Sequence, residues 1–336
     1  MTNSEPTIDR ALAGALAEAA ATAGHAPSVH NTQPWLWRVH YDRLDLLAAR
    51  ERQLTAIDPR SRLLLLSCGA ALHHARAALA AEGWAVDVRR LPDPQEPDLL
   101  ASLVPTGRTP ATPEAMRLVQ AMQVRHTDRR PVADEAVPAE ALESIVAAAS
   151  EGARLQVLDR DQLIGLASAA TRAAAAEAQD PDIAAELAYW TSRAPAEGVG
   201  LPTQVLPEHA AQTTVPARDF GRTGTLPVGA GHDRAAVYAV LFGDDDEADS
   251  WLRAGEALSA AWLTATSLGV SIVPLSGVIE VTATRETLRR ELAGLGYPYL
   301  VLRIGIADPE HAGPPHTPRM PAAQTIDTSA VRDAVQ

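Results

Sequence analysis

Two short stretches of the sequence combine side chains that suit a polar, negatively charged ligand. The first, A-P-S-V-H-N-T-Q-P-W at positions 26–35, places hydroxyl and amide groups on a proline-braced turn between a predicted helix and a predicted strand. The second, R-H-T-D-R-R-P at positions 125–131, has three arginines and a threonine within six residues. Guanidinium groups bind phosphate through paired hydrogen bonds, so the second stretch predicts phosphate recognition.

Each stretch also has an ordinary structural interpretation. The turn at 26–35 can be a plain connection in which Ser28 or Asn31 bonds the local backbone, and arginines on a loop can simply be solvated. The formal net charge of the chain is −13, from 29 Lys+Arg against 42 Asp+Glu. Against this acidic background a cluster of arginines is less expected by chance, and the same acidity argues against a nucleic-acid partner.

Other residues whose side chains could bind a metal or react are better explained by structural roles. His73 and His74 are expected to point to different faces of a helix and lack a third ligand at metal-site spacing. The acidic run at 244–247 precedes a predicted helix, where the macrodipole favours negative charge, so a cation site is the weaker interpretation. Cys68 lies in an apolar run and predicts core packing. We therefore expect no metal site, and without a G-x-G-x-x-G after a strand no Rossmann domain.

The elements that must position the two stretches follow from periodicity and from glycine and proline punctuation. We predict helices at 9–23, 61–82, 114–124, 139–149, 162–178, 183–193, 249–268 and 285–292. Strands are predicted at 35–40, 44–48, 84–88, 154–158, 237–242, 270–273 and 299–304. Residues 91–113 hold six prolines and predict a connection with only a short helix, and the proline-rich tail after 308 is expected to wrap the surface.

Two of the long helices align without gaps at a constant offset of 186 residues. Leu66, Gly69, Leu72 and Gly83 coincide with Leu252, Gly255, Leu258 and Gly269, and a predicted strand follows each final glycine. Two independent alanine-rich helices, each with a glycine cap, are the alternative. Because the non-alanine matches share one register, the pattern favours an internal duplication.

Together the two stretches resemble the flavin-binding signatures of the nitroreductase superfamily, an Arg-x-Ser/Thr-x-Arg/Lys loop and a Pro-Ser-x-x-Asn-x-Gln-Pro-Trp turn. Two weaker features agree with that resemblance. The segment V-P-L-S-G at 273–277 lies where the family places a Pro-x-x-Gly turn against the flavin ring, and T-P-R at 317–319 lies where it supplies a basic residue to the phosphate. The resemblance covers nearly the whole chain and implies bound flavin mononucleotide (FMN).

The order of the motifs differs from that of ordinary family members, in which one chain carries the arginine loop first and two chains share each flavin. Here the first half lacks an arginine loop at 3–10, and the second half lacks a Pro-Ser turn near 151–155. Each half has kept what the other lost. The chain therefore resembles the Acg-like branch, and we expect an α+β nitroreductase-like fold in which two tandem halves form an intramolecular pseudo-dimer with one flavin site.

The resemblance also implies a division of the chain and a set of site residues. The halves would span 1–112 and 113–307, with a lid insertion at about 194–232 and a tail at 308–336. The residues implied to bind the cofactor are Ser28, Asn31, Gln33, Arg125, His126, Thr127, Arg129, Pro274, Leu275, Ser276, Gly277 and Arg319. Because the flavin carries the chemistry in this family, no catalytic side chain is expected.

Two functions follow from the resemblance. In the first, NAD(P)H reduces the flavin, which reduces nitro- or quinone-type small molecules. In the second, the chain stores or sequesters FMN beneath a closed lid. A single cysteine, no signal-peptide pattern and no run of about 20 apolar residues favour a cytoplasmic protein without a membrane partner. We expect a monomer that acts as a pseudo-dimer.

Overall fold

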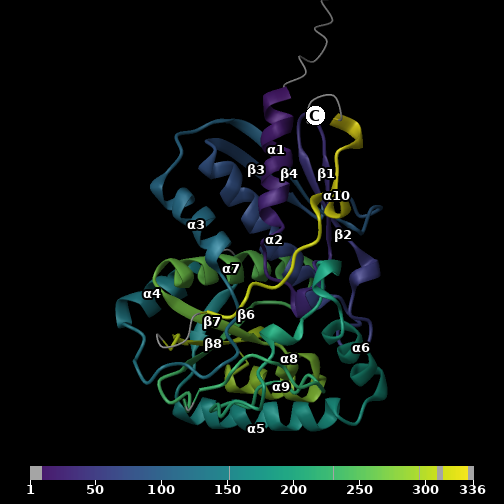
Figure 1. Cartoon of the computed structure of the whole chain (residues 1–336). Helices are drawn as coiled ribbons and strands as arrows, with labels where there is room; N and C mark the ends of the chain where they lie inside the picture. The colour runs from purple at the N-terminus through teal and green to yellow at the C-terminus, as the bar shows by residue number, and fades with distance from the viewer. Residues whose placement is uncertain (1–9, 151, 230, 295, 309–312, 332–336) are drawn as a thin grey trace, which may run out of the picture.

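The computed structural model describes residues 10–150, 152–229, 231–294, 296–308 and 313–331 (Figure 1). Residues 3–9 of the missing arginine loop, Glu151 of the missing Pro-Ser turn and parts of the tail lie outside these ranges. The described chain is built from helices and two antiparallel-based sheets, which confirms the α+β class.

The first sheet comes mostly from the N-terminal part of the chain. Its strands are β1 (Trp35–Val39), β2 (Leu44–Ala48), β3 (Trp84–Arg90) and β4 (Leu99–Arg108), in the order β3-β4-β2-β1. The alternating residues Trp35 and Trp37 of β1 are fully buried, as period-2 patterning predicts for a strand with one core face. A short strand from the C-terminal tail, β9 (Ile326–Asp327), adds to β1 in parallel.

The second sheet repeats the order of the first. Its strands are β5 (Arg154–Val157), β6 (Val237–Gly243), β7 (Val270–Leu275) and β8 (Tyr297–Ile306), in the order β7-β8-β6-β5. The helix α2 (Arg62–Ala81) joins β2 to β3, and α7 (Ala248–Ser267) joins β6 to β7, so the two sheets and their central helices correspond one to one. This shared topology confirms the duplication that the helix alignment predicts.

The remaining elements cover the two sheets or connect them. The helices are α1 (Arg10–Ala23), α3 (Pro113–Val124), α4 (Ala139–Ala148), α5 (Arg160–Glu177), α6 (Pro181–Thr191), α8 (Gly277–Glu280), α9 (Thr282–Glu291) and α10 (Ala322–Thr325). The 3-10 turns are η1 (Val29–Asn31), η2 (Arg50–Arg52), η3 (Pro195–Glu197), η4 (Thr203–Val205) and η5 (Ser329–Val331).

The helices α2 and α7 pack against each other at the centre of the molecule, where their two aligned glycines meet. A methyl group on Gly69 would overlap the carbonyl of Leu252, and one on Gly255 would overlap the carbonyl of Leu66. These clashes exchange when the two halves are exchanged, which is the signature of a twofold interface. The helices can approach this closely only because both positions lack a side chain.

Polar contacts add to this seam between the halves. Glu256 of α7 is fully buried and pairs with Arg76 of α2 at 2.7 Å and with Arg90 of β3 at 2.6 Å. His73 and His74 each place Nδ1 within about 3.0 Å of the hydroxyl of Ser259 on α7. We expected the two side chains to point to different faces of the helix, but both contact the same hydroxyl on α7. Their contacts fit the structural role that the sequence predicts.

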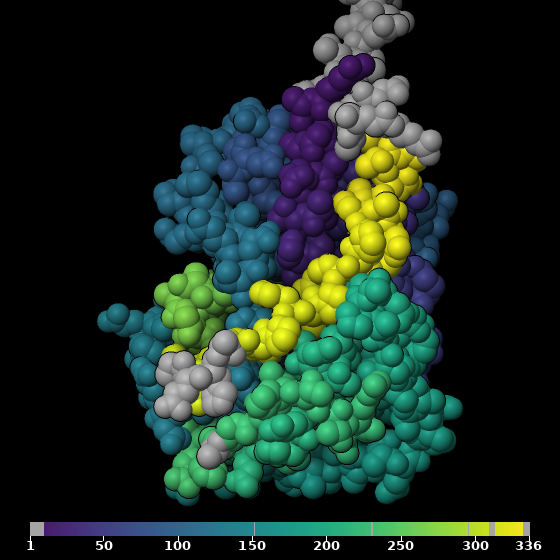
Figure 2. All heavy atoms as spheres, viewed as in Figure 1, coloured from purple at the N-terminus to yellow at the C-terminus, as the bar shows by residue number. Residues whose placement is uncertain are grey.

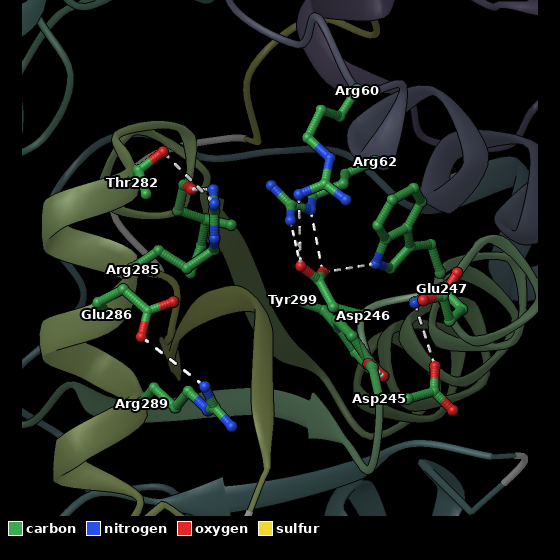
Figure 3. A network of polar contacts seen from close by, with 12 residues as sticks. Arg60, Arg62, Asp245, Asp246, Glu247, Thr282, Arg285, Glu286, Arg289 and Tyr299 are labelled. Atoms are coloured by element: carbon green, nitrogen blue, oxygen red, sulfur yellow. Dashed lines mark hydrogen bonds and ion pairs between the residues drawn. The ribbon is translucent and has the colours of Figure 1, made fainter.

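Asp246 of the acidic run at 244–247 contacts Arg62 of the other half, as the close view in Figure 3 shows. Asp246 accepts hydrogen bonds from Arg62 at the start of α2 and from Trp251 Nε1 at 3.0 Å. Asp244 pairs with Arg154, and Asp245 accepts from the backbone of Glu247. These carboxylates therefore have protein partners, in keeping with the structural interpretation.

Two expectations about elements are wrong. Residues 99–108 form the ten-residue strand β4 rather than an irregular connection with a short helix. Pro105 is tolerated there because it lies at a register shift against β3 and beyond Leu103, where the pairing of β4 with β2 ends. The insertion between β5 and β6 is also larger than 194–232, because α5 and α6 belong to it whereas the equivalent β1–β2 connection is a short hairpin.

The C-terminal tail runs from the second half back across the first. Figure 2 shows it crossing the surface between α1 and the lid insertion, and Figure 1 shows it ending beside β1. The parallel pairing of Ile326 with Trp37 fixes this end. The tail therefore ties the two halves together, with Arg319 midway along its course.

The helix α2 has a length and composition that a membrane span could have, contrary to the expectation that no such stretch exists. An 18-residue window of this helix has a mean hydropathy of 1.3, but 83% of that window is buried inside the molecule. The apolar residues of α2 contact the sheet and α7, so its hydrophobicity is that of a core helix.

The start of α2 predicts a measurable pH dependence of stability. Asp58 Oδ2 accepts from Leu64 N at 2.9 Å, and burial raises the pKa of this carboxyl from about 3.8 to about 7. Between these values the folded protein keeps a proton that the unfolded chain has lost, so stability falls as pH rises towards 7. Each pKa unit is worth about 1.4 kcal/mol.

Asp58→Asn mimics the protonated group and removes this dependence. We expect the variant to gain stability relative to wild type between pH 5 and pH 8 in urea unfolding. If the free energy of unfolding changed with pH in the same way for both proteins, Asp58 would not be the source of the pH dependence.

Candidate functional site

The turn around η1 is held in an unusual backbone conformation. His30, Asn31 and Gln33 have positive φ angles of 46°, 56° and 49°. Such angles are uncommon outside glycine and are maintained only where surrounding contacts fix them. Ser28 Oγ accepts from Gln33 N at 2.9 Å, so the local bond expected of an ordinary turn is present. The side chains of Asn31 and Gln33 also contact distant parts of the chain.

Asn31 and Gln33 connect the turn to the lid insertion and to the tail. Asn31 Nδ2 donates to Gly200 O at 3.1 Å and to Pro318 O at 2.9 Å. Gln33 Nε2 donates to Gly198 O at 2.6 Å, and Gln33 Oε1 accepts from Met320 N at 3.0 Å. These amides therefore bring together segments that lie more than 160 residues apart in sequence.

A cavity of about 740 Å³ opens beside this turn and is lined by both halves of the chain. Ten of the residues singled out from the sequence line it: Ser28, Asn31, Arg125, Thr127, Arg129, Pro274, Leu275, Ser276, Gly277 and Arg319. Two do not. Gln33 is buried behind the turn, and His126 faces His316 with ring centroids 6.1 Å apart on the outer side of the loop.

Arg125 and Arg319 lie together at one end of the cavity. Arg125 is only 5% exposed, lies over the ring of Trp262 at 4.5 Å and donates to His25 O at 3.4 Å. Arg319 donates to the same carbonyl at 3.2 Å and to Asn31 Oδ1 at 2.9 Å. Neither forms a salt bridge with a carboxylate of the described residues, and each has a buried Nε without a hydrogen-bond partner.

The electrostatics of this end favour an anion. Burial, and then the neighbouring Arg319, lower the pKa of Arg125 to about 9, while burial lowers the pKa of Arg319 to about 10. Both groups remain cations near pH 7. A buried and a partly buried cation without a counter-charge are costly, and a phosphate would satisfy them with charge-assisted hydrogen bonds. The hydroxyls of Thr127 and Thr317 line the same cavity.

Arg129 lies apart from this pair. Its Nη1 donates to Val205 O at 3.2 Å, and the guanidinium is 5.5 Å from the ring centroid of Phe220, so it faces the lid insertion. Burial lowers the pKa of Arg129 to about 10. The structure thus does not group Arg129 with Arg125, although both arise from the same loop.

The segment 274–277 forms part of the cavity wall where β7 ends and α8 begins. A methyl group on Gly277 would come within 3.1 Å of Glu177 Oε1 and 3.2 Å of Arg218 Nη2. Gly277 therefore lets this charged pair lie close to the wall.

The sequence predicted a lid insertion but did not identify which of its residues contribute to the site. Residues 206–211, 213 and 215–223 line the cavity, and Arg218 reaches Glu177, Glu280 and His30. Arg218 is a charged residue in a proline- and glycine-rich segment, which is the signal that could have singled it out. Its partners, from α5, α8 and η1, could not be paired with it from sequence spacing.

Comparison with known proteins adds to this geometry. The chain is 36% identical over 319 residues to "Putative NAD(P)H nitroreductase Rv3131" of Mycobacterium tuberculosis (strain ATCC 25618 / H37Rv), covering 91% of this chain and 89% of the relative. It is 34% identical over 319 residues to "Putative NAD(P)H nitroreductase acg" of the same strain, covering 92% and 94%. The chain belongs to the nitroreductase family.

No family model matches the chain. Among solved structures, the chain is similar to the FMN-dependent nitroreductase NfnB from Mycobacterium smegmatis in complex with NADPH, at 17% identity and a TM-score of 0.40. That similarity covers 63% of this chain and 97% of the other.

Within the nitroreductase family, the relative named acg agrees with the Acg-like resemblance drawn from the order of the motifs. The two half-sets of motifs meet in one cavity at the seam, because the turn of the first half and the arginine loop of the second both line it. This arrangement is the one expected of a fused pseudo-dimer with a single site.

Proposed function

We propose that this nitroreductase is an FMN-dependent oxidoreductase that takes reducing equivalents from NAD(P)H and passes them to nitro- or quinone-type small molecules. The observation that carries the proposal is the pair of buried Arg125 and partly buried Arg319, which lacks a carboxylate partner among the described residues and lines a cavity built from both halves. The names of the relatives support the choice of NAD(P)H as donor.

The residues present fit FMN. Arg125 and Arg319 would hold the phosphate, and the hydroxyl of Thr127 would bond the phosphate or the ribityl chain. Arg129 lies towards the lid and would bond the ribityl chain or the polar edge of the ring. Ser28 and Asn31 would reach the cofactor from the first half, with the segment 274–277 against its ring. Gln33 and His126 would act by supporting the turn and the loop.

The chain's own groups would orient the reactants and restrict water. Bound FMN would supply the acceptance and donation of hydride. The lid residues 206–223 cover the cavity, and the apolar ring of Phe220 lies edge-on to His30 at 5.8 Å. Closure of such a segment excludes water from the reacting groups.

A second function, storage or sequestration of FMN, is favoured by one specific observation. The lid insertion is anchored through Arg218, whose guanidinium is buried against two carboxylates. If that anchor holds permanently, a hydride donor cannot reach the cofactor. The two functions therefore differ in whether the lid opens.

Anaerobic mixing of the FMN-loaded protein with NADH or NADPH distinguishes them. We expect the flavin absorbance to bleach within seconds, which would exclude storage. Leu226 N donates to Leu206 O at 2.9 Å, so residues 208–225 can be replaced by a short linker without moving the ends of the lid. Bleaching only in that shortened variant would establish the closed-lid function, and bleaching in neither would contradict the proposed reductase.

We further propose that the halves divide as 1–112 and 113–307, with the tail at 308–336, and that the chain acts as a cytoplasmic monomer. The repeated strand order supports the division. The single cysteine, Cys68, is buried and donates to Pro34 O at 3.1 Å, which suits a reducing compartment.

A further inference from the structure

A buried ionic cluster lies beside the cavity, and two of its three members, Glu177 and Arg218, line it. Arg218 of the lid donates through Nη2 to Glu177 Oε1 at 2.7 Å and to Glu280 Oε2. The side chains of Arg218, Glu177 and Glu280 are 8%, 9% and 3% exposed. The two carboxylates come from α5 and α8, so one guanidinium of an irregular segment bridges two helices.

This cluster brings two carboxyl groups against one guanidinium. Arg218 Nη1 lies 2.9 Å from His30 Nε2, and burial followed by the charge of Arg218 holds the pKa of His30 well below its usual range. His30 is therefore neutral and accepts the hydrogen bond from Arg218. Arg218 is thus the only cation that pairs with these two carboxyl groups among the described residues.

Acceptor capacity in the cluster is also unused. Glu280 Oε1 is buried and has no hydrogen-bond partner in the described part of the chain. Burial, and then the neighbouring Glu280 carboxyl within hydrogen-bonding reach, raise the pKa of Glu177 against the opposing charge of Arg218. The buried oxygen of Glu280 can accept a further hydrogen bond from any donor that enters beside Arg218 or replaces it.

The position of the cluster relates it to the proposed cofactor site. Glu177 and Arg218 line the cavity and lie against Gly277, the residue proposed to face the flavin ring. The neighbouring wall is apolar and small, because Ala170, Ala173 and Ala174 of α5 line it. A flat apolar group with a cationic end would match this combination of wall and carboxylates.

We propose that Glu177 and Glu280 form an anionic subsite for the positively charged planar group of a small-molecule reactant, such as an amidinium or a guanidinium. Arg218 is the occupant that the chain itself supplies when no such molecule is bound. The placement of this subsite beside the cofactor rests on the proposed function, but binding of the cation does not.

The subsite should select cations because leaving Glu177 and Glu280 without a cationic partner costs free energy. When the lid withdraws Arg218, two carboxylates in a largely buried site lose their only paired cation among the described residues. An incoming cation restores the charge-assisted hydrogen bonds, whereas a neutral isostere does not. Cationic molecules therefore bind with the help of the carboxylates and compete with Arg218.

The test compares benzamidine with its neutral isostere benzamide by isothermal titration calorimetry. In Arg218→Ala we expect benzamidine to bind at least tenfold more tightly than benzamide and at least tenfold more tightly than it binds to wild type. Arg222→Ala is the matched control, because Arg222 is also a lid arginine lining the cavity but donates to the backbone of Thr191. This control should match wild type.

Removal of the carboxylates completes the test. Adding Glu177→Gln and Glu280→Gln to Arg218→Ala should abolish the preference for benzamidine. If Arg218→Ala does not fold, the variant that lacks residues 208–225 removes the same arginine and should show the same preference. Equal binding of benzamidine and benzamide by either folded variant would overturn the subsite.

The outcome is separable from that of the proposed function. Calorimetry is carried out on both FMN-free and FMN-loaded protein and does not depend on flavin reduction. If neither NADH nor NADPH reduces the flavin, the proposed reductase function is contradicted, but the preference for benzamidine over benzamide still tests the subsite. A reducible protein without that preference would retain the reductase and contradict the subsite.

Discussion

Arg125→Ala/Arg319→Ala protein is expected to purify without FMN, whereas wild type retains it. The Arg125 guanidinium is buried and that of Arg319 is partly buried, and neither forms a salt bridge to a carboxylate of the described residues. Hydrogen bonds to charged groups are each worth about 1.5–3 kcal/mol, so loss of both should weaken FMN binding by about 100-fold or more. Fluorescence titration of the apoprotein with FMN measures this change.

Riboflavin provides the sharpest control for the role of the arginines. It lacks the phosphate, so the double variant should bind riboflavin as well as wild type does while losing its preference for FMN. Circular dichroism of the apoprotein checks that the variant is folded. If the variant kept wild-type affinity for FMN, or lost FMN and riboflavin equally, the phosphate would not be held by this pair.

Arg129→Ala should behave differently, because Arg129 faces Val205 and Phe220 rather than the other two arginines. The arginine loop alone would have grouped Arg125 with Arg129 as phosphate ligands. The geometry instead pairs Arg125 with Arg319 of the tail, 194 positions later in the sequence. The contribution of Arg129 should therefore appear with riboflavin as well as with FMN.

Gly69→Ala should have the largest effect on stability. The added methyl group would overlap the Leu252 carbonyl and lie about 3.0 Å from Gly255 Cα, and both neighbours are backbone atoms of a buried helix. They cannot move aside without separating α2 from α7. Overpacking of a rigid core commonly costs about 1–3 kcal/mol, and we expect a loss at or above the upper end of that range.

Gly14→Ala is the matched control for this substitution. Gly14 lies inside the helix α1, and no heavy atom would lie within 4 Å of the added methyl group. Alanine at an open helical position should raise the free energy of unfolding by about 0.5–1 kcal/mol. Urea unfolding of the two variants gives opposite shifts if α2 and α7 meet as described. A small effect of Gly69→Ala would contradict this close packing.

The sequence alone determined the family and the duplication. The turn at 26–35 and the arginine loop at 125–131 are local patterns, and the aligned glycines Gly69 and Gly255 are separated by a constant offset. Such features can be recognised from the sequence because each depends on neighbouring residues or on a repeated period. They were sufficient to predict an α+β pseudo-dimer with one site at the seam.

Only the tertiary structure decided which charged groups meet. The strand β4 formed in spite of Pro105 because pairing with β2 ends before that residue, a fact about neighbouring strands rather than about propensity. The cluster of Arg218 with Glu177 and Glu280 joins a loop to two helices, and Arg319 reaches Arg125 along the tail. Charge pairing depends on distances of a few ångströms in space, which sequence separation does not encode.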